Sequence, residues 1–569
     1  MGATDIAGRM ATSIFGCEAL PPSFTSCLDV PKGGVLFALP ALLSSGLLNH
    51  ADKYFQLPSG FYRLDSLFLL LAFTALSRVK SIDLLRLLPP GEWGKLLGLD
   101  RCPEVRTLRE KLKIITQDGK PEEWAGELCR DWMTADPEAA GILYVDGHVR
   151  VYTGKKTQLP RHYVSRMKLA ARATTDYWVN AMDGQPFFVI NKEIDPGLIQ
   201  VLEEDILPRL AMDLPEQLML FDEEDPDAHR FMLVVDREAY SPSFMANLRE
   251  VGIACMTYHK YQKEDWPESE FKEQIVTLAA GNEVKMKLAE REVSSIGDVK
   301  LRAREIRKLN ESGKQTSVLT TNYKGDKEVL APAMFARWSQ ENFFKYMKKH
   351  YNIDRLADYT LEKISDTQKV VNPQYRDIEN DIKKKAAKLG RVKLCFADIE
   401  LKDIDPKEVE EYQHKKALLR EEIMALEEEL NDLKECRKGT PKHVLFSDLP
   451  EEDNHKKLGT SGKYFIDTIK MIAYRAETIM VGIVRDVIRR ADEARALVSA
   501  IYETEADILP DYEKKILKVR LHQLANRATA KTVSHMCNEL NSTRTVYPGT
   551  DLRLVYEIIS KENTEGVFG

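Results

Sequence analysis

Three acidic side chains stand where metal-dependent chemistry could be done. Two of them, Asp146 and Asp236, follow the apolar runs at 143–145 and 231–235. A carboxylate inside or at the end of an apolar strand is costly to bury unless it is paired or holds a cation. Side chains at the carboxyl ends of strands in an open α/β sheet converge on one crevice, so the two aspartates could share a divalent cation such as Mg²⁺. The alternative for Asp146 is a turn, because Asp-Gly is a common hairpin dipeptide.

The third candidate, Glu341, lies in a stretch of helical periodicity at 331–350. Arg337 precedes it by four residues and Lys348 follows it by seven, so all three side chains project from about one helix face. A carboxylate between two cations is often part of a surface ion-pair ladder. Four aromatic residues between 338 and 346 favour instead a helix that packs into a core.

The elements that must position these residues are those of an α/β domain. Residues 141–153 have the composition of β structure with a central Asp-Gly turn, and 187–190 and 231–236 are further apolar strands. Helical stretches at 197–211 and 242–251 lie between and after them. This order predicts a multidomain α/β protein with a central mixed sheet.

Other units surround that domain, because 569 residues are too many for one core. Apolar residues recur three and four apart from Val409 to Leu433, interrupted by Lys416, and 378–396 could supply an antiparallel partner helix. The predicted units are an N-terminal segment (1–59), a helical, helix-turn-helix-like unit (60–117), the catalytic core (140–254 and 331–365), a β-rich insertion (255–330), a helical coiled-coil hairpin (373–437) and a C-terminal α+β region (456–569).

Composition is that of an ordinary globular protein, with 43% hydrophobic and 30% charged residues. The eight cysteines form no CxxC pair, which argues against a zinc site and for a reducing compartment. The apolar stretches at 33–49 and 66–77 are too short to span a membrane, so a cytoplasmic protein is expected. The net charge of −7 disfavours a nucleic-acid binder, but residues 300–349 hold 12 Lys and Arg against five Asp and Glu.

At these motifs the chain resembles bacterial insertion-sequence transposases of the DDE class. In the relevant subgroup the third catalytic segment reads Tyr, two residues, Arg, three residues, Glu, six residues, Lys. Arg337, Glu341 and Lys348 keep that spacing, whereas Met334 occupies the tyrosine position. Residues 236–240, Asp-Arg-Glu-Ala-Tyr, match the second segment. The resemblance covers about 140 to 350.

The resemblance implies a ribonuclease-H-like catalytic domain interrupted by a mainly β insertion. Asp146, Asp236 and Glu341 would hold two Mg²⁺ or Mn²⁺ ions, and Arg337 and Lys348 would contact DNA phosphate. The implied reactions are phosphodiester hydrolysis and strand transfer at transposon ends, sometimes through a DNA hairpin. The implied partners are double-stranded terminal repeats, target DNA and a second copy of the chain in a synaptic dimer. Association with the nucleoid would follow.

Two other functions stay open at this point. The missing tyrosine leaves room for a transposase-derived DNA-binding protein without strand-transfer activity. A two-metal DNA nuclease of the same fold would cut DNA without joining it.

Further DNA contacts are predicted outside the core. A helix at 104–115, which would begin at Pro103, carries Arg106 and Arg109 like a recognition helix, although any solvated helix face does the same. Trp266 could stack an unpaired base, but a core aromatic is the commoner case. For His148, two residues after Asp146, a structural hydrogen-bonded role is expected.

Overall fold

A computed structural model describes residues 20–559, together with Ala7 and Met10, apart from positions 59, 153–160, 165–168, 193–195, 217–223, 226, 263, 279–282, 336–337, 355–360, 364–368, 400–405, 449–455, 459, 489 and 525–526. Among these residues, no helix combines the length and apolarity needed to cross a membrane.

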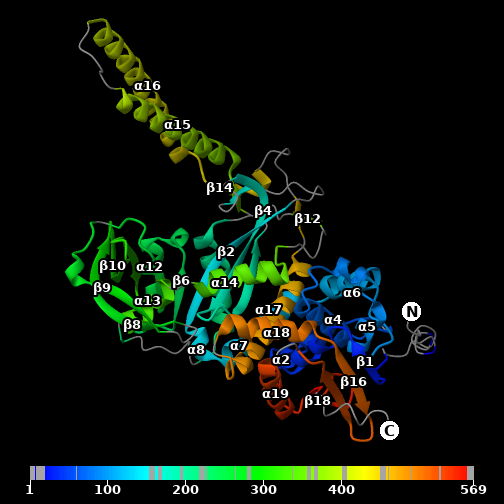
Figure 1. The fold of residues 1–569 in the computed structure, drawn as a ribbon. Coiled ribbons are helices and arrows are strands. Elements are labelled where there is room, and N and C mark those ends of the chain that lie inside the picture. Colours follow the sequence, from blue (N-terminus) through cyan, green and yellow to red (C-terminus); the bar gives the residue numbers. More distant parts are fainter. Residues whose placement is uncertain are drawn as a thin grey trace.

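A mixed sheet forms the centre of the molecule (Figure 1). Its strands run in the order β5-β4-β2-β6-β7. Strands β2 (Ile142–Val151), β4 (Leu169–Ala181) and β5 (Pro186–Lys192) are antiparallel neighbours. Strands β6 (Phe231–Val235) and β7 (Ile253–Tyr258) run parallel to β2. The predicted α/β class with a mixed sheet is confirmed.

The Asp-Gly turn predicted at 146–147 is wrong. Asp146 and Gly147 lie inside the continuous strand β2, where they pair with Trp178 and Tyr177 of β4. The ladder to β4 extends on both sides of the dipeptide and therefore overrides its local preference for a turn.

Alternation along the strands gives the sheet two distinct faces. Tyr144, Met232 and Val234 share one face and pack in a common cluster with helix α13 (Lys327–Phe335). Their sequence neighbours point to the opposite face and join the main hydrophobic core of the protein. We call the first of these the α13 face.

Four further strands continue the sheet beyond β7. Strand β11 (Gln315–Thr320) pairs antiparallel with β7, and β10 (Val299–Leu309), β9 (Glu283–Ile296) and β8 (Lys272–Thr277) follow in order. All four lie between β7 and α13 in the sequence. The described part of 255–330 is thus mainly strand.

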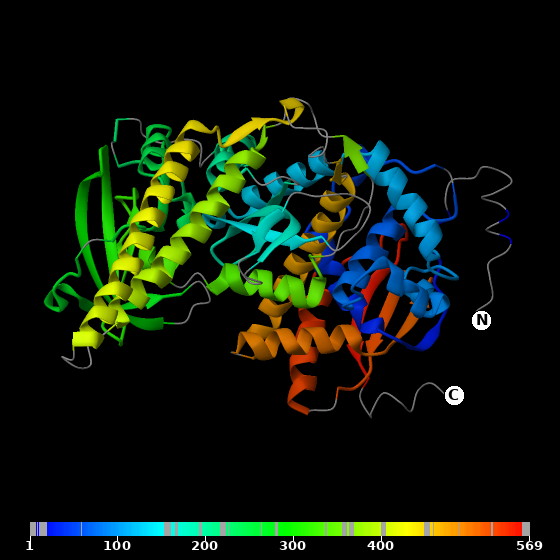
Figure 2. The same ribbon diagram turned by 90° about the horizontal axis from the view of Figure 1, so that it is seen from above.

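The two ends of the chain build one region together, and Figures 1 and 2 show their blue and red segments side by side. Strand β1 (Cys27–Val30) pairs with β16 (Ala506–Asp511). The sheet continues with β17 (Ile516–Leu521), which pairs with β16, and then β18 (Arg553–Ile558). Helix α17 (Ser461–Arg485) packs on N-terminal helices. Segments that look separate in the sequence therefore share one core.

Aromatic rings mark the centre of that core. The ring of Phe465 on α17 lies 5.4 Å from Phe55, 5.3 Å from Phe68 and 5.8 Å from Trp124, measured between centroids. The contacts with Phe55 and Phe68 are edge-to-face, and such contacts add to the stabilisation from burial alone.

Helices α15 (Pro373–Asp398) and α16 (Pro406–Gly439) form a hairpin that projects from the body (Figure 1). Seen from above, it extends toward the side that holds β8–β11 (Figure 2). Ion pairs such as Lys388–Glu422 at 2.8 Å and Lys393–Glu427 at 2.6 Å join its arms.

The remaining elements are η1 (Gly33–Ala38), α2 (Leu39–Ser44), α3 (Ala51–Tyr54), α4 (Leu64–Leu76), η2 (Ile82–Leu87), α5 (Pro90–Leu96), α6 (Val105–Asp118), α7 (Pro121–Ala135), α8 (Pro137–Ala140), β3 (Arg161–Val164), α9 (Leu198–Val201), η4 (Leu202–Ile206), α10 (Leu207–Asp213), η5 (Arg237–Ala239), α12 (Pro242–Glu250), η6 (Glu268–Glu270), α14 (Trp338–Tyr346), η7 (Met347–Tyr351), β12 (Leu361–Lys363), β13 (Lys369–Val371), β14 (His443–Leu445), η8 (Phe446–Asp448), β15 (Lys456–Leu458), α18 (Ala491–Glu503) and α19 (Arg527–Ser542).

Candidate active site

Asp146 and Asp236 occupy equivalent positions on neighbouring parallel strands. In the β2–β6 ladder Val145 is paired with Val235, and each aspartate is the next residue of its chain. Neighbouring strands are about 4.8 Å apart, so the two Cα atoms are separated by about 5 Å. Paired residues of a parallel ladder point to the same side of a sheet, which places both aspartates on the α13 face.

Backbone contacts orient both carboxylates. Oδ1 of Asp146 accepts a hydrogen bond from the Gly147 N–H at 2.9 Å, and Oδ1 of Asp236 accepts one from the Arg237 N–H at 2.6 Å. The carbonyl oxygen of Asp236 also accepts a hydrogen bond from the Thr257 hydroxyl of β7 at 3.1 Å. Asp236 is thereby held beside the sheet one residue beyond the end of β6.

The segment that carries Glu341 crosses the same face. At one end, the Tyr144 hydroxyl donates a hydrogen bond to the Ala333 carbonyl of α13. At the other end, the ring of Phe344 on α14 stacks on His148 with centroids 5.2 Å apart. Tyr144 and His148 flank Asp146 by two residues each along β2, so α14 lies over the strand that carries Asp146.

The contacts of Trp178 independently show that α14 lies over β2 near Asp146. It is the direct partner of Asp146 in the β2–β4 ladder and therefore points to the same face. Its ring lies 5.3 Å from Phe343 and 6.4 Å from Phe344. Phe343 and Phe344, which follow Glu341, thus pack on the sheet, which favours the core-facing interpretation of this helix over a surface ion-pair ladder.

Glu341 itself is placed by its backbone. It lies in α14 one helical turn before Phe344, within the stretch between the two anchors on Tyr144 and His148. Its side chain lies outside the described residues, as does Arg337 altogether. Convergence of all three carboxylates stays a prediction.

Lys348 and His148 share a carboxylate that the sequence pattern does not reveal. Nε2 of His148 lies 2.5 Å from Oδ1 of Asp354, and Nζ of Lys348 lies 3.5 Å from Oδ2 of the same residue. His148 is buried, whereas the other two side chains are about one-third exposed. Asp354 therefore holds Lys348 near the end of β2.

Comparison with known proteins decides the family. A family model described as "Transposase protein" matches residues 1–560. The chain belongs to this transposase family. The match confirms the predicted transposase and extends to the terminal regions, which the motifs at 140–350 do not reach.

Among solved structures, the piggyBac transposase synaptic complex with hairpin DNA aligns with 56% of this chain and 66% of that chain, slightly under two thirds, at 11% identity and a TM-score of 0.29. A search of curated proteins finds no match.

A buried carboxylate of the transposase, Glu477 on α17, fixes the end of the Glu341 helix. The hydroxyls of Tyr346 and Tyr351 donate hydrogen bonds to it at 2.6 and 2.5 Å. Arg78 lies 2.5 Å and Arg495 3.8 Å from its oxygens. Burial raises the pKa of both tyrosines well above the usual range, so the hydroxyls remain donors.

Asp176 of β4 is a further buried carboxylate near the candidate site, and it has a structural role. It is 1% exposed and lies 2.5 Å from Nε of Arg150 in a buried charged layer between the sheet and α17. Lys463 and Asp467 of α17 belong to the same layer. A buried carboxylate already paired with a guanidinium is not available as a metal ligand.

The candidate DNA contacts outside the core fall in different places. Helix α6 begins at Val105, so Pro103 lies before the helix and the predicted start is wrong. Arg106 is 90% exposed beside Glu110, and Arg109 lies 2.5 Å from Asp83. Both arginines are on the surface, and their DNA contact stays a prediction.

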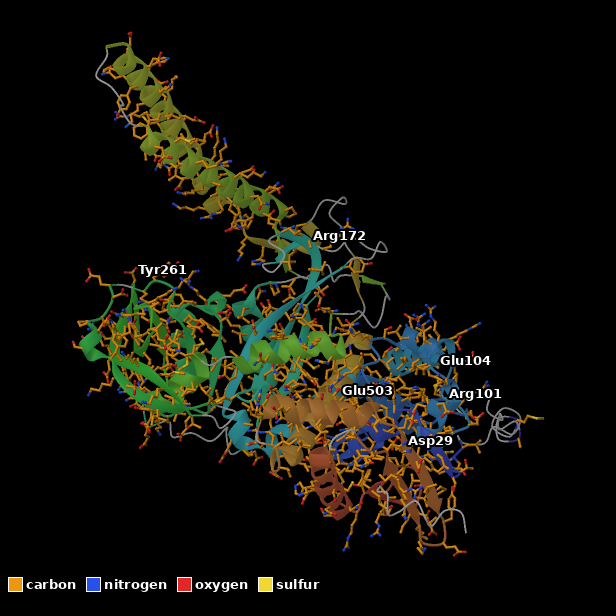
Figure 3. All side chains as sticks on the ribbon, in the orientation of Figure 1. Asp29, Arg101, Glu104, Arg172, Tyr261 and Glu503 are labelled. Carbon is orange, nitrogen blue, oxygen red and sulfur yellow. The ribbon has the colours of Figure 1, made fainter. Side chains whose placement is uncertain are left out.

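Trp266 is 6% exposed, so the predicted stacking on an unpaired base is not open to it here. The guanidinium carbons of Arg291 and Arg307 lie 4.4 and 4.2 Å from its ring. In Figure 3, Tyr261, which lies five residues before it, is on the opposite side of the molecule from Glu104 at the start of α6. The structure favours the core-aromatic alternative.

Glu305 of β10 is the centre of another buried polar cluster in the inserted strands. It accepts hydrogen bonds from Ser317 at 2.6 Å and Arg307 at 2.8 Å, and His259 lies 3.4 Å away. Burial raises the pKa of Glu305, but these hydrogen bonds outweigh it and lower the pKa to about 2. The cluster ties β10 to β11 and to the end of β7.

Proposed function

We propose that this transposase cuts and joins DNA with Asp146, Asp236 and Glu341 as ligands for two Mg²⁺ or Mn²⁺ ions. The observation that carries the proposal is the pairing of Val145 with Val235, because it sets two carboxylates side by side on neighbouring parallel strands, directly after the last residues that pair β2 with β6. The anchors of α13 and α14 on either side of Asp146 support Glu341 as the third ligand.

The donor set fits such ions. Two carboxylates on one face whose Cα atoms are about 5 Å apart are close enough for a cation to stabilise both charged forms. Hard divalent cations prefer carboxylate oxygen and keep several waters, so few protein ligands suffice. When bound, two ions of this kind activate a water or a 3′-hydroxyl and stabilise the leaving oxygen of a phosphodiester.

Arg337, which comes just before α14 in the sequence, and Lys348, which follows it in η7, would bind the DNA backbone. Arg337 suits bidentate contact with phosphate, and Lys348 acts as a point charge. Nζ of Lys348 lies 3.5 Å from Oδ2 of Asp354, so Asp354 already holds the lysine in position. A DNA phosphate would then bind the same ammonium group. His148 and Asp354 thereby serve as positioning residues rather than ligands.

The wider assignment follows from this site. We propose that strands β2, β4, β5, β6 and β7 with α14 are a ribonuclease-H-like core, and that β8–β11 are its β-rich insertion. The substrates would be double-stranded terminal repeats and target DNA. A homodimer would hold the two transposon ends during synapsis.

A strand-transfer assay tests the proposal. The chain is incubated with labelled terminal-repeat DNA from the sequence flanking its gene, target DNA and Mg²⁺. We expect cut and joined products that disappear with EDTA. Asp236→Ala should abolish both products and retain DNA binding, whereas Asp183→Ala, in the exposed turn after β4, should behave as the wild type.

Each result has a defined meaning. Cutting without joining would identify a nuclease, and binding without either product would identify a transposase-derived DNA-binding protein. Full activity of Asp236→Ala would refute the assignment of the ligands.

A further inference from the structure

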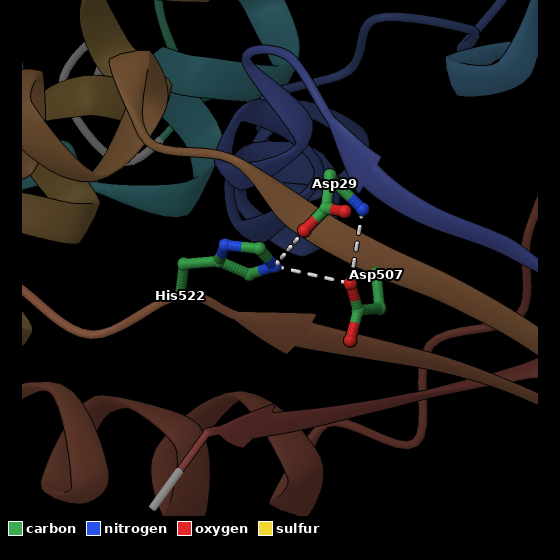
Figure 4. Close-up of side chains that lie close together, drawn as sticks. All are labelled: Asp29, Asp507 and His522. Atoms are coloured by element: carbon green, nitrogen blue, oxygen red, sulfur yellow. Dashed lines mark hydrogen bonds and ion pairs between the residues drawn. The ribbon is translucent and has the colours of Figure 1, made fainter. Parts of the chain in front are cut away.

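We propose a second, structural metal site at Asp29, Asp507 and His522, far in sequence from the carboxylates of the core. Asp29 belongs to β1, Asp507 to β16, and His522 follows β17 (Figure 4). One ligand atom from each residue lies within 4.8 Å of the others. The site would take a divalent transition ion of the Zn²⁺ type.

The separations of these atoms suit coordination. Nε2 of His522 lies 3.0 Å from Oδ1 of Asp507 and 3.5 Å from Oδ1 of Asp29 (Figure 4). Zn²⁺ binds such atoms at about 2.0–2.2 Å, so these separations correspond to angles at the ion of about 90–115°. Those angles are within the range of a distorted tetrahedral site with water in the remaining position.

Polar groups lie behind two of the three proposed ligands. Nδ1 of His522, the ring nitrogen that faces away from the cluster, lies 3.8 Å from Oε2 of Glu505. The second oxygen of Asp507 accepts a hydrogen bond from Arg520 at 2.9 Å. A donor behind a ligating carboxylate orients that ligand, and Glu505, which is beyond hydrogen-bond distance, adds negative charge beside the imidazole.

The local charge also calls for a cation. Asp29, Glu505 and Asp507 bring three negative charges, and Arg520 brings one positive charge. These four side chains carry a net charge of −2, which a divalent ion balances. Asp507 is 4% exposed and accepts hydrogen bonds from the Asp29 N–H at 3.1 Å and from Arg520 at 2.9 Å, whereas the Asp29 side chain is 73% exposed and leaves a path for entry.

The ligand types select the ion. Imidazole nitrogen favours Zn²⁺ and its neighbours in the transition series, whereas Mg²⁺ prefers oxygen alone. The ion would join β1, near the start of the chain, to a sheet whose other strands come from its end. Since the ion would bind these three side chains only where the fold brings them together, it would stabilise this terminal sheet.

Zinc binding to the full chain tests the proposal. Equilibrium dialysis against Zn²⁺, with Mg²⁺ in large excess to occupy the core carboxylates, gives the number of ions bound. We expect the wild type to bind one Zn²⁺ more per chain than Asp29→Asn or His522→Ala, and Zn²⁺ to raise the unfolding temperature of the wild type only. Asparagine tolerates the positive φ of 50° at position 29, so the first variant keeps the local backbone.

The matched control is His535→Ala. His535 also lies near an aspartate, 3.7 Å from Asp486, at similar exposure, but outside the cluster. It should keep the wild-type stoichiometry and thermal shift. If Asp29→Asn and His522→Ala both fold and bind as much Zn²⁺ as the control, the three residues are a hydrogen-bonded clasp only and the proposal is wrong.

Discussion

Substitution of Glu477 by glutamine tests how the Glu341 helix is held. Glu477 is fully buried and accepts hydrogen bonds from Tyr346, Tyr351 and Arg78, with Arg495 close by. Glutamine keeps the volume but removes the charge, and its amide NH₂ group must face donors. Two guanidinium groups are left beside a neutral side chain.

The expected loss is large because the anion is inaccessible to water. Removing one partner of a buried ion pair costs about 3–5 kcal/mol. The side chains of Arg78 and Arg495 are 14% and 22% exposed. Because water can partly hydrate them, the loss of stability should lie at the lower end of that range, about 3 kcal/mol. The surface pair Glu493–Arg490, at 3.0 Å and more than half exposed, supplies the control, and Glu493→Gln should change stability by under about 1 kcal/mol.

Denaturant unfolding and hydrogen exchange measure the effect. Glu477→Gln should lower the unfolding midpoint and speed amide exchange in 338–351 more than in the central sheet, because Glu477 holds that segment through the hydroxyls of Tyr346 and Tyr351. The reasoning fails if Glu477→Gln and Glu493→Gln are equally stable, or if exchange in 338–351 is unchanged.

Three other substitutions have defined outcomes. A Cβ on Gly34 would lie 1.9 Å from the Ile501 carbonyl oxygen, so Gly34→Ala should separate the N-terminal segment from α18 and lower the melting temperature. The control is Gly126→Ala, because a Cβ there would meet only the end of the Arg130 side chain at 3.9 Å. This variant should stabilise the protein by about 0.5–1 kcal/mol. The lowered pKa of Glu305 stabilises the fold above its usual pKa of 4.5, and this contribution is lost as the pH falls from 4.5 to about 2. Glu305→Gln should therefore show a flatter decline of the denaturation midpoint in that interval, and an equal decline would contradict the assignment. Trp266→Ala should destabilise the inserted strands by about 3–5 kcal/mol but leave DNA affinity in a mobility-shift assay unchanged, and weakened binding by a folded variant would restore its predicted DNA contact.

The local pattern of the sequence was sufficient for several elements. Apolar runs before Asp146 and Asp236 predicted strands, and the aromatic flanks of Glu341 predicted a helix that packs inward. Repeats of three and four residues between Val409 and Leu433 predicted a long helix, which is observed as part of α16. These features follow from side-chain period, which is a property of neighbouring residues.

Tertiary structure alone decided the rest. The turn expected at Asp146 gave way to a strand because β4 pairs across it, and Trp266 was buried by arginines from strands later in the chain. Glu477 meets Tyr346 across 131 positions, and β1 meets β16 across almost the whole chain. Contacts between residues so distant leave no periodic trace in the sequence, since each depends on how separate elements pack and on which register their strands adopt.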